Sequence, residues 1–207
     1  MDASQEEIGR FYKTPTGLLY PSVTTITGQL GKEGILQWRK RVGEKEADRI
    51  SSRAADRGTK LHTLCEDYIN NKPIEAKDFV SYDMFASIKS TLDENLDNVH
   101  MQEVPLYSDY LQTAGRVDCV AEWEGKLSII DFKSSSKPKY REWIQNYFMQ
   151  AAAYAVMYEE LTGKPISKLV IVVAVENDSP QVFIEKRDDH INGFIRLREK
   201  YRETYGR

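Results

Sequence analysis

The sequence is poor in cysteine and histidine, and it contains no long hydrophobic run. Among its 207 residues are two cysteines, Cys65 and Cys119, and three histidines. Two cysteines cannot form a disulfide framework, a four-cysteine zinc site or an iron–sulfur cluster, so no such cluster is expected. No apolar segment approaches the roughly 18 residues that a membrane-spanning helix requires, so we expect no membrane association.

The overall charge is close to balanced. Lys and Arg total 29 against 32 Asp and Glu, and 41% of the residues are hydrophobic. This composition excludes disorder as the main state and argues against a protein that simply coats nucleic acid, although not against an enzyme that acts on it. The length predicts a single domain over residues 1–207. The acidic start, Met1–Glu7, has no features of a leader peptide, so we expect a cytoplasmic protein in a bacterium or a phage-infected host cell.

Hydrophobic periodicity predicts alternating helices and strands. The expected helices cover about 33–70, 79–96 and 142–162, with a last one from about 188; the expected strands cover about 103–111, 115–123, 126–134, 169–173 and 181–186. This order predicts an α/β fold with a central mixed β-sheet flanked by helices. An N-terminal helical layer would cover about 1–98, and the α/β core about 99–207.

A tight turn between two of these strands sets a specific register. Glu124-Gly125 is a favourable two-residue hairpin turn, because glycine tolerates the positive φ that such turns need. The turn places Asp118 opposite Asp131 and Arg116 opposite Lys133. Because side chains alternate along a strand, Asp118, Asp131 and Lys133 are expected on one face.

Two opposed carboxylates repel one another unless a cation lies between them. Ligation by carboxylates and a backbone carbonyl suits Mg²⁺ or Mn²⁺, and the Lys133 ammonium would lie beside the metal, able to hold a water or a phosphate oxygen. The alternative is a solvated strand face of alternating charge, and a slip of one residue would separate the pair.

Two further pairs are spaced to share a helix face. His62 and Glu66 could offer an imidazole and a carboxylate to a metal, although a surface histidine near a glutamate is common. Gln150 and Tyr154 could hydrogen-bond a phosphate or a base, or could only border the core.

Basic and aromatic residues suited to a nucleic acid lie on both sides of the acidic hairpin in the sequence. The candidate DNA-binding residues are Trp38, Arg39, Arg57, Lys137, Lys139 and Arg141. Tyr140, Trp143 and Tyr147 could stack on unpaired bases, or could belong to the core, as is favoured for Tyr147.

The ordered motifs resemble a known family. The motifs are Arg57-Gly58-Thr59-x-x-His62-x-x-x-Glu66, Gly115-x-x-Asp118, Asp131-Phe132-Lys133-Ser134 and Gln150-x-x-x-Tyr154. Together with Tyr20–Ile26 and the Trp38–Gly43 stretch, this set resembles the RecB-like branch of the PD-(D/E)xK nucleases. Within that branch it is similar to the phage exonucleases and the mitochondrial genome maintenance exonuclease group.

The resemblance implies a restriction-endonuclease-like core and a role for each motif residue. Asp118, Asp131, His62 and the carbonyl of Phe132 would bind Mg²⁺ or Mn²⁺, and Lys133 would position or activate the attacking water. Glu66 would lie behind the ligands or on a second metal. Gln150 and Tyr154 would shape the DNA-facing side. Val117 stands where the family name has proline, and the cluster-binding cysteines of some relatives are absent.

The sequence therefore predicts a metal-dependent exonuclease that acts on single-stranded or end-containing DNA in replication, recombination or repair. Two alternatives remain open. One is a structure-selective endonuclease or junction resolvase on the same fold. The other is a non-catalytic nucleic-acid-binding module, which the completeness of the Asp118, Asp131 and Lys133 set disfavours.

Overall fold

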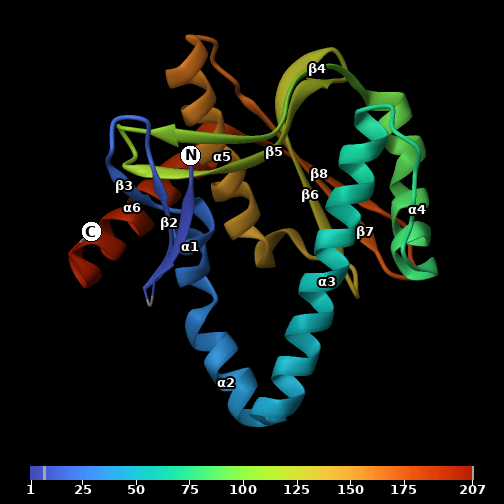
Figure 1. Ribbon diagram of the computed structural model, residues 1–207, viewed down its shortest axis with the longest axis horizontal. Helices are drawn as coiled ribbons and strands as arrows, with labels where there is room; N and C mark the ends of the chain where they lie inside the picture. The colour runs from blue at the N-terminus through green and yellow to red at the C-terminus, as the bar shows by residue number, and fades with distance from the viewer. Residues whose placement is uncertain (7, 207) are drawn as a thin grey trace.

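A five-stranded mixed sheet forms the centre of the computed structural model, which describes residues 1–6 and 8–206 (Figure 1). Its strands, in spatial order, are β4 (Leu96–Ser108), β5 (Thr113–Trp123), β6 (Lys126–Ser135), β7 (Lys168–Val175) and β8 (Gln181–Lys186). Only the β6–β7 pair is parallel, and α5 (Gln145–Thr162) makes the crossover between these two strands. The α/β class and the mixed sheet predicted from the sequence are confirmed.

Helices cover both faces of this sheet. On one face α5 and α6 (Arg187–Tyr205) pack against residues such as Ile129 and Ile171; on the other, α3 (Glu44–Ile69) and α4 (Phe79–Asn95) pack against Ile130 and Val172. Successive residues of β7 therefore enter opposite cores, as expected for a continuous apolar strand. None of the described helices is long and apolar enough to cross a membrane.

The N-terminal region is not entirely helical, which corrects the expectation for residues 1–98. It begins with a small antiparallel sheet of β1 (Ala3–Glu6), β2 (Gly9–Lys13) and β3 (Leu19–Pro21). Then follow α1 (Val23–Thr27), a 3₁₀ turn η1 (Gly28–Leu30) and α2 (Lys32–Val42). Strands of three to five residues are too short for a clear alternation of apolar and polar residues, so the sequence pattern does not reveal them.

The helix expected over about 33–70 is divided at Gly43. This residue has φ 88° and ψ 146°, which ends α2 and turns the chain into α3. In Figure 1 the two helices form a V that extends away from the sheets. Arg39 of α2 is bonded to Glu44 and Asp48 of α3 across the bend. No side chain of α2 is buried, so the V is held mainly at its bend and where its helices join the rest of the fold.

The predicted register of the β5–β6 hairpin is confirmed. Glu124 and Gly125 both have positive φ, and the pairs run from Trp123–Lys126 to Cys119–Ile130. The ladder ends there, and Asp118 and Asp131 lie one residue beyond this last pair, each on its own strand. The predicted Arg116–Lys133 pairing is wrong, because the β5–β6 ladder does not extend beyond Cys119–Ile130.

Two of the sequence motifs meet inside the fold, where β5 passes under α5. A Cβ atom on Gly115 would lie 2.7 Å from the Tyr154 hydroxyl oxygen and 2.9 Å from its Cε1 atom. Tyr154 is 2% exposed, so its ring has no room to move aside. Glycine at position 115 therefore allows α5 to approach the strand that carries Asp118.

We expect Gly115→Ala to lower the free energy of unfolding by about 1–3 kcal/mol, because the added methyl group overpacks a closed core. Urea unfolding followed by circular dichroism measures this loss. Gly34→Ala is the matched control, since a Cβ atom there meets nothing within 4 Å, and alanine in a helix is favoured over glycine. A Gly115→Ala protein as stable as the Gly34→Ala protein would contradict the packing argument.

Candidate active site

The candidate site lies where α3 crosses the ends of β5 and β6. Leu61, Leu64 and Cys65 anchor one face of α3 in the core, which holds the neighbouring His62 against the sheet. The His62 Nε2 atom lies 2.7 Å from the carbonyl oxygen of Phe132. Helix and strand thus bring together two of the ligands predicted from the sequence.

The two aspartates of the hairpin are both buried at this point. Asp118 is 8% exposed, and its Oδ2 atom accepts a hydrogen bond of 2.9 Å from the Phe132 N–H group. The His62 Nδ1 atom lies 3.7 Å from the same oxygen. Asp131 is 1% exposed and directly precedes Phe132. The structure therefore places His62, Asp118 and the Phe132 carbonyl within reach of one another, with Asp131 next to Phe132 in β6; that these groups bind a metal stays a prediction.

A third carboxylate, Glu103 of β4, completes the cluster, and the sequence analysis missed its role. Its neighbours pair as Gln102–Cys119 and Val104–Val117, which puts Glu103 opposite Asp118. Its Oε1 atom lies 3.7 Å from His62 Nδ1, and ligand atoms of His62, Glu103 and Asp118 all lie within 4.8 Å of one another. Acidic residues thus occupy one row across three adjacent strands.

The backbone at Glu103 is strained, with φ 51°. A non-glycine residue in this region costs about 1–3 kcal/mol and is often found at functional sites. Glu66, predicted from its position one turn after His62, is not part of this carboxylate group. The sequence signal for Glu103 would have been the β4–β5 register, but the turn at Asp109–Gln112 has no glycine dipeptide to define it.

Lys133 and Gln150 hold the two oxygens of Asp131. The Lys133 Nζ atom lies 2.5 Å from Asp131 Oδ2 and 5.2 Å from the centre of the Tyr147 ring. The Gln150 side-chain amide donates a hydrogen bond of 2.8 Å to Asp131 Oδ1. Gln150 therefore orients the Asp131 carboxylate from α5. Tyr154 is buried against Gly115, so its side chain does not form the DNA-facing surface that the resemblance implied.

Burial and like charge shift the pKa values of this cluster. Burial and the nearby Asp131 raise the pKa of Asp118. Burial alone would lower the pKa of Lys133, but Asp131 and Asp118 raise it overall. Burial alone would also lower the pKa of His62, but Glu103 and Asp118 outweigh burial and raise this pKa to about 9. The carboxylates thus create a strongly negative site that favours cations.

The residues present fit a hard divalent cation. The Asp131 Oδ2 atom is buried, and the Lys133 ammonium lies 2.5 Å from it, so this oxygen already faces a positive charge. Carboxylate and carbonyl oxygens are the ligands that Mg²⁺ and Mn²⁺ prefer, and an imidazole is compatible with Mn²⁺. Asp118, Asp131, Glu103, His62 and the Phe132 carbonyl are the available donors.

The predicted DNA-binding residues divide into three groups. Arg57 lies on α3 beside Glu176, and its Nε atom is buried without a partner in the described part of the chain. Lys137 is exposed and Lys139 half-buried in the segment that follows β6. The remaining three lie elsewhere or are already paired: Trp38 and Arg39 are on α2, and Arg141 binds Glu185 through two hydrogen bonds.

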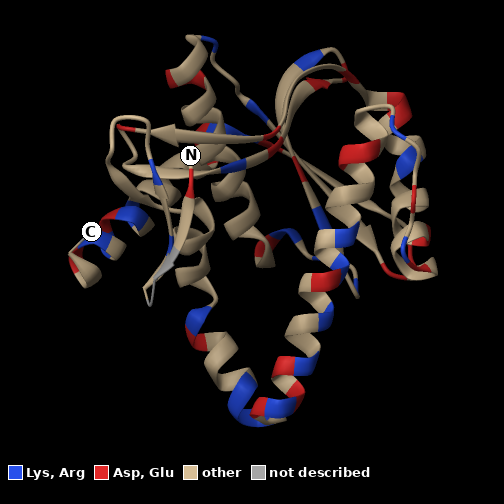
Figure 2. Cartoon of the chain, in the orientation of Figure 1, with Lys and Arg blue, Asp and Glu red and all other residues tan. Residues whose placement is uncertain are grey.

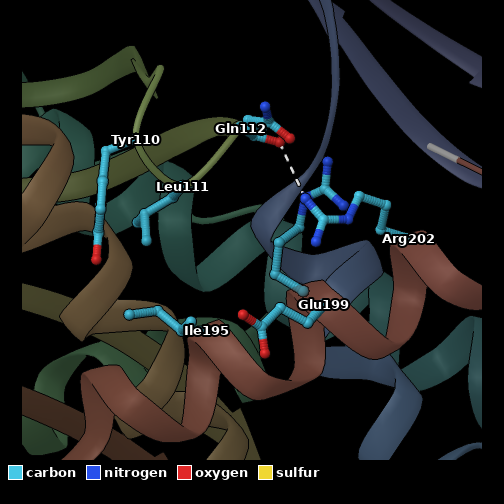
Figure 3. A pocket seen from close by; sticks show the side chains of 7 residues that line it. Tyr110, Leu111, Gln112, Ile195, Glu199 and Arg202 are labelled. Carbon is cyan, nitrogen blue, oxygen red and sulfur yellow. Dashed lines mark hydrogen bonds between the residues drawn. The ribbon is translucent and has the colours of Figure 1, made fainter.

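A small pocket of about 190 Å³ lies between α6 and the turn from β4 to β5 (Figure 3). Among its lining residues, Arg198 is 7% exposed and donates a hydrogen bond of 3.1 Å to the carbonyl oxygen of Gln112. This bond ties the turn to α6. No residue of the carboxylate cluster lines the pocket, so it forms no part of the candidate site.

Comparison with known proteins agrees with this arrangement. The family model of the PD-(D/E)XK nuclease superfamily matches residues 83–205. The human Mitochondrial genome maintenance exonuclease 1 is 28% identical over 176 residues, and the Xenopus tropicalis protein is 30% identical over 177. Each alignment covers 77% of this chain and 50% of the relative, so the chain spans about half the length of these relatives. They give no support to the expected bacterial or phage-infected location.

Two solved structures align at lower similarity. A candidate exonuclease from Eubacterium rectale has a TM-score of 0.40 and 12% identity, covering 87% of this chain and 69% of its own. The structure of SSO0001 has a TM-score of 0.41 and 14% identity, covering 83% and 70%. The family match spans Glu103, Asp118, Asp131 and Lys133, the acidic row and its lysine. The chain belongs to the PD-(D/E)XK nuclease superfamily.

Proposed function

We propose that residues 1–207 form one nuclease domain that hydrolyses phosphodiester bonds of DNA with the help of Mg²⁺ or Mn²⁺. The observation that carries this proposal is the complete group of Asp118, Asp131 and Lys133 at the end of one hairpin. A binding module derived from a nuclease would have no need to keep two buried carboxylates beside a half-buried lysine, because such a group destabilises the fold unless it is compensated.

The proposed metal ligands are Asp118, Asp131, His62, Glu103 and the Phe132 carbonyl. A bound divalent cation would neutralise the scissile phosphate and lower the pKa of a bound water. Gln150 holds the Asp131 carboxylate in place through Oδ1, and Oδ2, which faces the Lys133 ammonium, would be shared between that ammonium and the metal. Glu66 and Tyr154 act at most indirectly, from the helix behind His62 and from the core under Gly115.

Lys133 is placed to act on the substrate. Its ammonium is kept charged by Asp131 and Asp118, and its side chain is 18% exposed, so it reaches the surface of the cluster. There it can position the attacking water and stabilise the negative charge that develops on the phosphate. Arg57 and Lys137 would hold neighbouring phosphates.

The V of α2 and α3 favours an exonuclease over a junction resolvase. It stands beside the site that α3 helps to build, and basic and acidic residues alternate along it (Figure 2). If a strand is threaded between the two arms of the V, it has to enter by an end. On this basis we propose that the domain acts on single-stranded or end-containing DNA during replication, recombination or repair.

We expect Asp131→Asn and Lys133→Ala to reduce cleavage at least about 100-fold, because each removes a charge that stabilises the transition state. DNA affinity should fall far less. End-labelled oligonucleotides with Mg²⁺, Mn²⁺ or EDTA measure cleavage, and fluorescence anisotropy measures binding. Asp83→Asn and Lys164→Ala are matched exposed controls that should cleave normally. An Asp131→Asn protein that cuts at the wild-type rate would end the proposal.

A second prediction concerns Glu103 as a ligand. Glu103→Gln should weaken Mn²⁺ affinity about tenfold or more, measured by isothermal titration calorimetry and by the rise in Tm on adding Mn²⁺. Glu66→Gln and the exposed Glu94→Gln test the alternative carboxylate and the effect of net charge. Should Glu66→Gln lower the affinity while Glu103→Gln leaves it intact, the ligand assignment derived from the β4–β5 register is wrong.

A third prediction tests entry by an end. Linear single-stranded DNA should be degraded, whereas a covalently closed circle of the same sequence should resist. Both are followed on denaturing gels with Mn²⁺. The control is the same circle after a restriction enzyme has opened it at a site made double-stranded by an annealed oligonucleotide. Rapid cutting of the intact circle would favour the endonuclease alternative.

A further inference from the structure

We propose that Tyr140 and Trp143 form a stacking platform for unpaired bases of a strand held at the Asp118–Asp131 site. This inference rests on the proposed nuclease function and assigns it a base-binding element. The two side chains are 60% and 71% exposed, and their rings contact each other edge to face with centroids 4.7 Å apart. Two aromatic rings in mutual contact at the surface leave an apolar area exposed to solvent.

Exposure alone does not single out this pair, because Phe79 and Tyr110 are 79% and 74% exposed. What distinguishes the pair is its position in the chain. It lies in the segment 136–144 between β6, which carries Lys133, and α5, which carries Tyr147 and Gln150. Both ends of this segment are therefore fixed at the candidate site, where Lys133 lies over the Tyr147 ring.

The segment is held firmly on both sides of Tyr140. The Lys139 N–H group donates to the Gln181 side chain, whose amide donates back to the Lys139 carbonyl, at 2.6 and 3.0 Å. Arg141 binds the carboxylate of Glu185 in β8 through two hydrogen bonds, and Ile144 is 2% exposed. A fixed backbone presents the rings without a large loss of entropy on binding, as a preorganised ligand site requires.

The charge of the segment suits a polyanion. Lys137 and Lys139 lie beside Glu142, the one acidic residue among positions 136–144, whereas the charge of Arg141 is compensated by Glu185. Aromatic faces flanked by cations are typical of surfaces that bind single strands, because every base has a π-face and every nucleotide a phosphate. In a duplex these faces are covered by neighbouring base pairs. The platform therefore selects unpaired nucleotides.

The paired substitution Tyr140→Ala/Trp143→Ala tests the platform. It should weaken binding of an unpaired 20-mer about 10- to 100-fold, as expected for the loss of one or two stacked bases. Anisotropy in EDTA measures the affinity without cleavage. Tyr140→Phe/Trp143→Phe should retain most of the affinity. Tyr110→Ala removes an equally exposed ring from the β4–β5 turn and should change nothing.

An oligonucleotide with abasic sites identifies the bases as the contact. The wild-type protein should bind it about as weakly as the double alanine protein binds normal DNA, and the double alanine protein should not distinguish the two oligonucleotides. Equal weakening on both substrates would instead indicate a phosphate contact or a folding defect and would overturn the inference, as would unchanged affinity. Wild-type protein that neither binds nor cuts any DNA would refute the nuclease proposal itself.

Discussion

Repulsion between buried carboxylates is the constraint on which the rest of the structure depends. Asp118 and Asp131 each lie one residue beyond the last pair of the β5–β6 ladder, and Glu103 extends the row to β4. Such a row is unfavourable unless positive charge compensates it. In the absence of a metal, His62 from α3 and Lys133 from β6 contribute positive charge, and a bound divalent cation would replace the proton of His62. The fold therefore pays a stability cost at one place, which is reasonable only if that place has a function.

The surrounding packing serves to hold this row in place. Leu61 and Cys65 fasten α3 to the sheet on the side of His62. On the opposite side, Gly115 allows α5 to come close enough for Gln150 to reach Asp131. The two helices thus act on one pair of strands from two different cores. This arrangement explains why motifs far apart in the sequence belong to one site.

How much of the site can be predicted from the sequence depends on how local its cause is. The Glu124-Gly125 turn is a local signal, and it correctly specifies the register of the hairpin up to Cys119 and Ile130, the neighbours of Asp118 and Asp131. Glu103 depends on the pairing of β4 with β5, which no short-range signal in the sequence defines. The helix break at Gly43 is local, but glycine also occurs inside helices, as at Gly34 and Gly58. The positive φ at Gly43, and not its identity, separates α2 from α3.

The basic residues illustrate the limits of composition as a guide to partners. Arg39 and Arg141 are both paired with carboxylates, and both pairs are structural in position: one spans the bend of the V, and the other ties the segment 136–144 to β8. Arg57 also faces a carboxylate, that of Glu176, but among the described residues its buried Nε atom has no hydrogen-bond partner. A slightly acidic chain can therefore present a small number of effective cations near the carboxylates, while most of its basic side chains support the frame that positions them. A DNA strand bound by the domain would be attracted only by these few cations, through its phosphates. We expect them to act together with the proposed metal ligands and the exposed rings of Tyr140 and Trp143.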